Sequence, residues 1–140
     1  MTWIKYNQEK FLMPAKGKVL FMDDEQIIVD MTRDVLKFLD YEVMFAEDGL
    51  AAIDLYKKEK SAGVPFDVVI LDLTIPSGLG GKETIKELRK LDPGVKAIVS
   101  SGYTDDPAVL DFSDYGFCEK LTKPYNIHDL RRVLEDVMKK

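Results

Sequence analysis

Cysteine and histidine are almost absent from this sequence, which contains one of each among its 140 residues, Cys118 and His128. A single cysteine cannot form an internal disulfide or a cysteine-ligated metal site, and a free, buried cysteine is typical of a reducing compartment. No apolar run reaches the length of a transmembrane helix, and the opening residues lack the continuous apolar segment of a signal peptide. We therefore expect a cytoplasmic protein without a membrane partner.

Basic clusters are also missing, since none is larger than the pair Lys139 and Lys140, and the formal net charge is −5. Phosphate backbones attract basic surfaces, so this charge argues against direct binding of nucleic acid. The length fits one domain and leaves no room for a separate output module. We predict an extension or linker over residues 1–16 and a single domain over residues 17–140.

The predicted extension is rich in large apolar side chains that follow no helical or alternating pattern. They are Trp3, Ile4, Tyr6, Phe11, Leu12 and Met13. We expect the aromatic residues either to dock on the domain or on a second copy of the chain, or to belong to a disordered tail.

What the sequence does contain is a regular alternation of strands and helices. The run Val68 to Leu71 consists of β-branched and large apolar residues, which indicates a central strand buried on both faces. Further strands are expected over residues 18–22, 41–46, 95–100 and 117–121. Helices are expected over residues 26–39, from 49 onward, over 82–91 and 105–112, and after an N-cap at Asn126. Five such alternations predict a doubly wound α/β fold, with a parallel sheet covered by helices on both faces.

Two of these helices have an apolar side that we expect to face the sheet. In the helix over residues 26–39 this side consists of Ile27, Ile28, Met31, Val35, Phe38 and Leu39. In the helix that starts near residue 49 it consists of Leu50, Ala51, Ile53, Leu55 and Tyr56.

Polar side chains follow four of the predicted strands at the point where each strand ends. They are Asp23, Asp24, Asp72, Ser101 and Lys123. Taken singly, an Asp or a Lys-Pro at such a place is more often an ordinary turn residue. Because the carboxyl ends of parallel strands meet at one edge of the sheet, where open α/β proteins bind ligands, the joint pattern predicts a functional site.

The chemistry of this set fits phosphoryl transfer. Three neighbouring carboxylates repel one another unless a cation neutralises them, and Mg²⁺ prefers hard oxygen ligands together with a phosphate. Carboxylates also form acyl phosphates, which makes Asp72 a candidate nucleophile. The amine of Lys123 and the hydroxyl of Ser101 are suited to stabilising phosphoryl oxygens.

The segments FMDDE, VILDLTIPSGLGG, IVSSGY and LTKPY together resemble the receiver domain of response regulators in two-component signalling. The resemblance extends from Lys18 to the end of the chain. It implies a flavodoxin-like receiver fold with five helices and a five-stranded sheet of order 2-1-3-4-5.

By this resemblance Asp72 accepts a phosphoryl group from a histidine kinase or phosphotransfer protein. Asp23, Asp24, Asp72 and the backbone carbonyl of Thr74 would hold Mg²⁺, while Ser101 and Lys123 would contact the phosphoryl group. The Lys123–Pro124 bond would be cis, as X-Pro bonds can be at low cost. Such a domain is a signalling switch, not an enzyme acting on other substrates.

The resemblance also predicts where the output lies. Phosphorylation would shift the surface formed by the strand over 95–100, the helix over 105–112 and the strand over 117–121. That helix, the last strand and the last helix together form a candidate face for a homodimer. The segments SSGYTDD and DLTIPSGLGG are similar to receivers attached to hybrid sensor kinases. A free-standing receiver and the receiver of a hybrid kinase are the two alternatives.

Some positions depart from the family pattern. Lys120 stands where the family places a switching aromatic residue, so a simple inward swing of a ring is not expected here. Thr74 and Tyr103 occupy two variable positions that tune hydrolysis of the aspartyl phosphate in the family. We hypothesise that Tyr103 shields the phosphate from water.

Other classes of protein fit less well. A haloacid-dehalogenase-type phosphatase needs a second acid two residues after its nucleophile, where this sequence has Thr74. A flavodoxin-like mononucleotide binder needs a phosphate loop rich in Ser, Thr and Gly in place of the acids that follow the first strand. His128 lies in the first turn of a predicted helix and is expected to be an exposed residue without a role in phosphotransfer.

Overall fold

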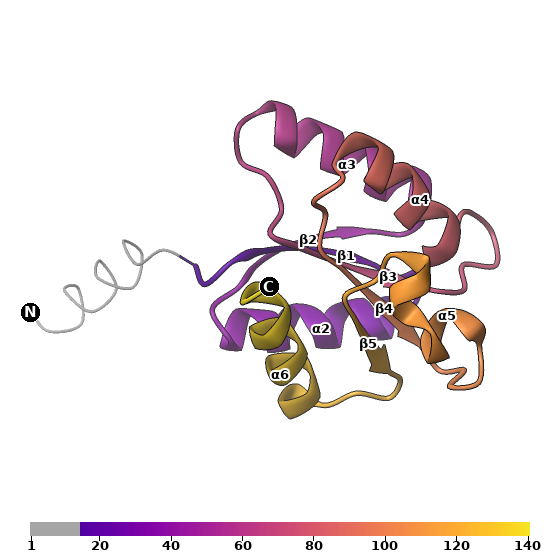
Figure 1. Ribbon diagram of the computed structural model, residues 1–140. Helices are drawn as coiled ribbons and strands as arrows, with labels where there is room; N and C mark the ends of the chain where they lie inside the picture. Colours follow the sequence, from indigo (N-terminus) through magenta and orange to yellow (C-terminus); the bar gives the residue numbers. More distant parts are fainter. Residues whose placement is uncertain (1–14) are drawn as a thin grey trace, which may run out of the picture.

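The computed structural model describes residues 15–140 and shows a five-stranded parallel sheet between two layers of helices (Figure 1). The strands are β1 (Lys18–Met22), β2 (Glu42–Ala46), β3 (Val68–Asp72), β4 (Ala97–Ser101) and β5 (Glu119–Thr122). The helices are α2 (Gln26–Phe38), α3 (Gly49–Ser61), α4 (Gly81–Leu91), α5 (Pro107–Leu110) and α6 (Ile127–Met138), with a short 3₁₀ helix, η1 (Phe112–Tyr115), before β5. The strand order β2-β1-β3-β4-β5 confirms the predicted doubly wound fold.

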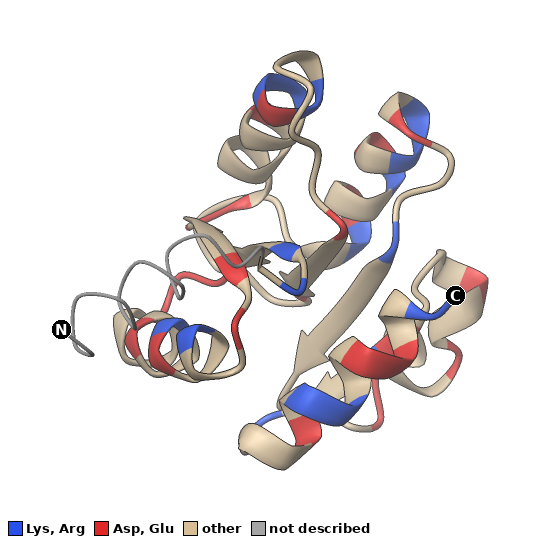
Figure 2. Cartoon of the chain, turned by 90° about the vertical axis from the view of Figure 1, so that its left-hand side faces the viewer, with Lys and Arg blue, Asp and Glu red and all other residues tan. Residues whose placement is uncertain are grey.

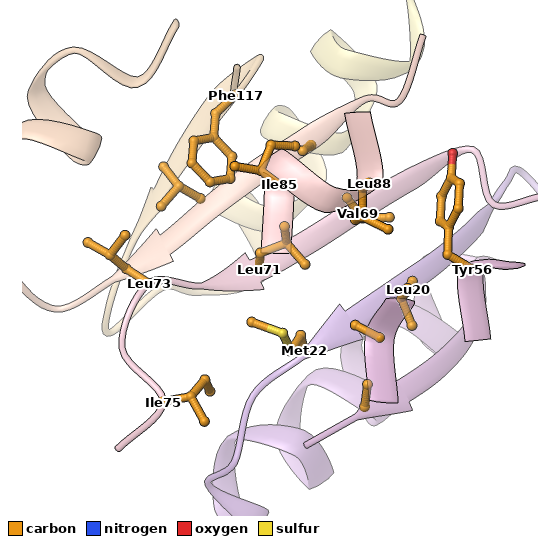
Figure 3. Close-up of a cluster of buried hydrophobic side chains, with 14 of the residues drawn as sticks. Leu20, Met22, Tyr56, Val69, Leu71, Leu73, Ile75, Ile85, Leu88 and Phe117 are labelled. Carbon is orange, nitrogen blue, oxygen red and sulfur yellow. The ribbon is translucent and has the colours of Figure 1, made fainter. Parts of the chain in front are cut away.

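Two apolar layers fix the sheet between the helices. On one side, side chains from β1, β3 and β4 pack against α3 and α4, and Leu71, Ile85 and Leu88 are fully buried there (Figure 3). On the other side, Phe21 and Ile70 pack against α2 and α6. Every residue of β1 and β3 is buried, as expected for central parallel strands.

Most element boundaries lie within two residues of their predicted positions. The main difference is the region predicted as one helix over residues 105–112, which forms the single turn α5 followed by η1. Asn126 caps α6 as predicted, since its side chain accepts a hydrogen bond from the Asp129 backbone N–H, and the Asp129 carboxylate accepts one from the Asn126 backbone N–H. No helix in residues 15–140 is long and apolar enough to cross a membrane.

The predicted apolar side of α2 is wrong for three of its residues. Ile27, Met31 and Phe38 are exposed, and the buried side of the helix is formed by Val29, Thr32 and Leu36. The helix carries apolar residues on both sides, and a polar threonine lies in the buried row. Hydrophobic periodicity alone therefore favoured a side that faces solvent.

The predicted inner side of α3 needs a smaller correction. Tyr56 is buried as expected, but Leu50 is 67% exposed, and Ala52 takes its place against the sheet. Leu50 lies in the first turn, where the helix begins at the edge of the sheet. Cys118 is only half-buried, in contrast to the expectation of a buried cysteine.

Residues 1–14 of the predicted extension lie outside the described residues, which begin at Ala15.

Candidate functional site

The predicted site residues come together at the carboxyl edge of the sheet. Parallel pairing places Asp72 of β3 beside Ser100 of β4, and Ser101 beside Thr122 of β5, while Asp23 follows directly after β1. A cleft of about 570 Å³ opens at this edge. It is lined by Asp24, Glu25, Asp72, Thr74, Pro76, Ser101, Gly102, Tyr103 and Lys123.

Three carboxylates converge on one side of this cleft. Asp23, Asp24 and Asp72 each offer an oxygen atom within 4.8 Å of the others. Asp24 is exposed, whereas Asp23 and Asp72 are only 1% and 4% exposed. Buried carboxylates at such short range repel one another, so the arrangement fits a site that receives a cation.

Lys123 supplies a positive charge to the same group. Its Nζ lies 2.7 Å from Asp23 Oδ2, 3.2 Å from Asp72 Oδ2 and 3.8 Å from Glu25 Oε1. Burial lowers the pKa of Lys123, but its hydrogen bond to Asp23 and the charges of the two aspartates outweigh that effect and raise the pKa above its usual value. Lys123 is therefore a charged ammonium at neutral pH that is shared by two buried carboxylates. The peptide bond that follows it, Lys123–Pro124, is cis as the resemblance predicted.

Asp72 has a strongly altered acidity. Burial raises its pKa from 3.8 to about 6, and repulsion from Asp23 acts in the same direction. The nearby Lys123 and a hydrogen bond from the Thr74 backbone N–H, 3.3 Å from Asp72 Oδ1, partly offset the rise. At neutral pH most of the Asp72 carboxyl is ionised but poorly solvated, which favours its reaction as a nucleophile.

The β3–α4 loop lies unusually close to the backbone of the strand it leaves. A Cβ atom on Gly80 would collide with the Leu73 carbonyl oxygen, and one on Gly81 would lie 3.0 Å from the Asp72 carbonyl oxygen. Glycine is therefore needed at these positions for the chain to fold back past Asp72. The loop leaves the Asp72 side chain accessible from the cleft.

Ser101 and Tyr103 form the opposite side of the cleft. Ser101 is buried, and its Oγ accepts a hydrogen bond of 2.9 Å from the Tyr103 backbone N–H. This contact leaves the Ser101 hydroxyl proton free to be donated. The Tyr103 side chain is 64% exposed at the mouth of the cleft.

Two residues near the site were not predicted from the sequence. Glu25 adds a fourth carboxylate near Lys123, and buried Tyr125 places its hydroxyl 3.4 Å from Thr32 Oγ1 of α2. Burial raises the pKa of Tyr125, whereas the neighbouring hydroxyls of Thr32 and Ser100 lower it. Tyr125 belongs to the segment LTKPY, so the sequence offered a signal that it lies near the site. Its contact with Thr32 could not be predicted in this way, because the two residues are 93 positions apart in the sequence.

Lys120 and His128 are both exposed. Lys120, at the position where the family has an aromatic switch, is exposed on β5. His128 is an exposed residue in the first turn of α6, away from the residues that line the cleft.

Comparisons with known proteins agree with this arrangement. The chain is 28% identical over 114 residues to sporulation initiation phosphotransferase F of Bacillus subtilis, an alignment that covers 81% of this chain and 87% of that protein. It is 31% identical over 123 residues to the chemotaxis protein CheY of Thermotoga maritima, which covers 87% and 98% of the two chains. The crystal structure of CheY4 from Vibrio cholerae superposes with a TM-score of 0.78 at 29% identity and covers 88% of this chain and 99% of that one.

Residues 19–135 match the family described as the response regulator receiver domain. This match includes β2 to β5, all of β1 except Lys18, and the residues that meet at the carboxyl edge. Together with the order of the sheet and the acidic cleft, it shows that the chain belongs to the response regulator receiver family of two-component signalling.

Proposed function

We propose that this chain is a phosphorylation-activated switch in which Asp72 accepts a phosphoryl group from a phosphohistidine of a histidine kinase or phosphotransfer protein. The observation that carries the proposal is the position of Lys123 Nζ between the buried carboxylates of Asp23 and Asp72, in a cleft shared with Ser101. A carboxylate, an amine and a hydroxyl at one strand edge are the groups that this reaction needs.

In the transfer, an Asp72 carboxylate oxygen forms a bond to phosphorus as the N–P bond of the phosphohistidine breaks. The histidine nitrogen leaves with the electron pair of that bond. Lys123, already within 3.2 Å of Asp72 Oδ2, is placed to stabilise the phosphoryl oxygens, and the Ser101 hydroxyl is placed to donate to one of them.

We propose that Asp23, Asp24, Asp72 and the backbone carbonyl of Thr74 hold Mg²⁺. The support is a set of hard oxygen donors that are close to one another and, for two of them, buried. When bound, Mg²⁺ neutralises the carboxylates and the charge that develops on the phosphoryl group.

The proposed output is a shift of the surface formed by β4, α5 and β5. Ser101 ends β4, so a hydrogen bond to a new phosphoryl group would pull on the strand that leads to α5. Phosphorylation would favour one of two arrangements already in equilibrium. Because Lys120 is exposed on β5, we expect it to meet a partner directly, with no ring moving inward at that position.

We also propose how the domain as a whole acts and what it binds. Residues 17–140 would act as one cytoplasmic signalling domain, which modifies only itself and self-associates through α5, β5 and α6. Direct binding of nucleic acid is not expected, because basic and acidic residues are interspersed along the helices (Figure 2) and the net charge is −5.

Intact-mass spectrometry after incubation with acetyl phosphate and Mg²⁺ tests the proposal. We expect a phosphoryl adduct on the wild-type chain that disappears with a chelator and in the Asp72→Asn variant. Asp54→Asn, which alters an exposed carboxylate on α3, is the matched control and should retain the adduct. An adduct that persists in Asp72→Asn, or none on the wild type with Mg²⁺ present, would contradict the proposed chemistry.

The position of Tyr103 at the mouth of the cleft supports the hypothesis that it limits access of water to the phosphorylated Asp72. Tyr103→Ala should speed hydrolysis of the phosphoryl group, measured by loss of the adduct over time. An unchanged hydrolysis rate would reject this role for Tyr103.

A further inference from the structure

The outer side of α2 carries a row of apolar side chains that nothing in residues 15–140 covers. Ile27 is 81% exposed, Met31 is 39% exposed and Phe38 is 70% exposed. Their spacings of four and seven residues place them along one line of the helix, and half-buried Val35 lies on the same side. We call the row formed by Ile27, Met31 and Phe38 the α2 stripe.

The α2 stripe differs from the other exposed apolar residues of the domain. Leu50, Val64, Leu91, Tyr103 and Leu110 lie on separate elements or loops. Single exposed apolar residues are ordinary on soluble proteins and need no explanation, whereas several on one helix face indicate a surface that is covered by something else.

The chain that leads into β1 passes one end of the α2 stripe. The Lys16 backbone N–H donates a hydrogen bond of 2.8 Å to the Asp40 carbonyl oxygen, and the Gly17 carbonyl oxygen accepts one of 3.0 Å from the Glu42 backbone N–H. Asp40 lies only two residues beyond Phe38, at the end of α2. The described chain therefore begins close to the Phe38 end of the α2 stripe.

Residues 1–14 would form a tether long enough to reach all of the α2 stripe. An α-helix rises 1.5 Å per residue, so Phe38 and Ile27 are about 16 Å apart along α2. The thirteen residues from Trp3 to Ala15 would span about 40 Å if fully extended. A tethered segment also has a high effective concentration at its site, which favours it over a separate molecule in dilute solution.

The composition of the tethered segment matches this surface. Its apolar side chains are Trp3, Ile4, Tyr6, Phe11, Leu12 and Met13. It also carries Lys5 and Lys10 beside Glu9, while exposed Asp34 flanks the α2 stripe on its polar side. Asp30, on the same side, is already paired with Arg33 at 3.1 Å. Apolar groups and opposite charges are thus available on the two sides of one contact.

We propose that residues 1–14 bind the α2 stripe within the same chain and bury Ile27, Met31 and Phe38. This contact does not depend on phosphorylation of Asp72, so its test is separate from the test of the proposed function.

Trp3 is the only tryptophan of the sequence and reports on the contact. In the full chain without Mg²⁺ or phosphodonor, we expect Trp3 emission to lie at shorter wavelength than in the urea-unfolded chain and to resist quenching by acrylamide. The double variant Met31→Ser/Phe38→Ser should shift the emission to longer wavelength and increase quenching. Leu50→Ser removes a comparably exposed residue from α3, in the opposite helix layer, and should leave both signals unchanged.

Hydrogen–deuterium exchange of residues 1–14, read by mass spectrometry, provides a second measurement that does not rely on Trp3 alone. Exchange should be faster in the double variant than in the wild type and in Leu50→Ser. If neither fluorescence nor exchange responds to the double variant, the proposal is wrong. Signals that change with protein concentration would instead identify a second copy as the occupant and would also overturn it.

Discussion

The carboxyl edge of the sheet and the outer side of α2 depart from ordinary burial in opposite ways. At the edge, the charged groups of Asp23, Asp72 and Lys123 are withdrawn from water. On α2, large apolar groups such as Ile27 and Phe38 remain in water. Burying charged groups is less favourable for folding than leaving them in water, and exposing large apolar groups is less favourable than burying them.

The difference indicates which kind of partner each of the two regions can bind. Buried carboxylates are stabilised by a cation or by a phosphoryl group with its counter-charges, whereas exposed apolar groups are stabilised by another apolar surface. Both regions would become more stable on binding, the first through compensation of charge and the second through burial of apolar surface. The rest of the domain, exemplified by Leu88 of α4, follows the ordinary rule.

The largest expected effect separates ordinary core from the α2 stripe. Leu88→Ala should lower the free energy of unfolding by about 2–5 kcal/mol, because it leaves a cavity in a fully buried site. Phe38→Ala removes a larger but mostly exposed side chain and should cost well under half of that. Urea unfolding of both variants measures the difference, and equal losses would show that Phe38 is a core residue.

The next effect concerns the buried charge at the carboxyl edge. The pKa of Asp72 is about 6 in the folded chain, above its ordinary value of 3.8, so the folded state binds the proton more tightly than the unfolded state. The free energy of unfolding therefore falls as pH rises from about 4 to 6, and the full penalty is present at higher pH.

Asp72→Asn removes this titration and should stabilise the chain at pH 7.5 without Mg²⁺ by about 1–3 kcal/mol. The advantage over wild type should shrink as pH falls from about 6 to 4. Thermal unfolding across this pH range measures it, with Asp54→Asn as an exposed control. An advantage that does not vary with pH would mean that burial of the Asp72 charge is not its cause.

The smallest effect concerns the contact between the carboxyl edge and the buried side of α2. Tyr125 follows the Lys123–Pro124 bond and contacts Thr32 of α2 through its hydroxyl. Tyr125→Phe keeps the ring packing and removes the hydroxyl group, so it should lower the free energy of unfolding by about 0.5–1.5 kcal/mol. The double variant Tyr125→Phe/Thr32→Val should cost less than the sum of the single variants, and strict additivity would argue against the contact.

The convergence of the side chains at the site could be predicted from the sequence because most of them stand at the end of an apolar strand. Parallel pairing then determines that Asp23, Asp72 and Ser101 meet, whatever the details of the helices. The outcome for α2 differed because Thr32 lies in the buried row and apolar residues lie on both sides of the helix. Periodicity cannot decide which of two apolar sides is buried. Here the buried side contains the polar residue Thr32, whose partner, Tyr125, is distant in the sequence.

The helix predicted before β5 was inexact for another reason. Asp106 caps α5, but only one helical turn follows. Local propensity there is weak, so contacts between distant residues decide where the turn ends. The same limit applies to Glu25 and Lys123, whose proximity depends on the completed fold.

The amino edge of the sheet brings the two ends of the domain together. A Cβ atom on Gly17 would lie 3.0 Å from Met138 Cε, and the Lys140 ammonium donates a hydrogen bond of 2.9 Å to the Cys118 carbonyl oxygen. A short linker could therefore join the last helix to the first strand, with new ends opened in the exposed turn near Gly63. Such a circular permutant would begin with β3 yet retain the same carboxylates in the same cleft, because their positions depend on strand neighbours and not on the order of the chain.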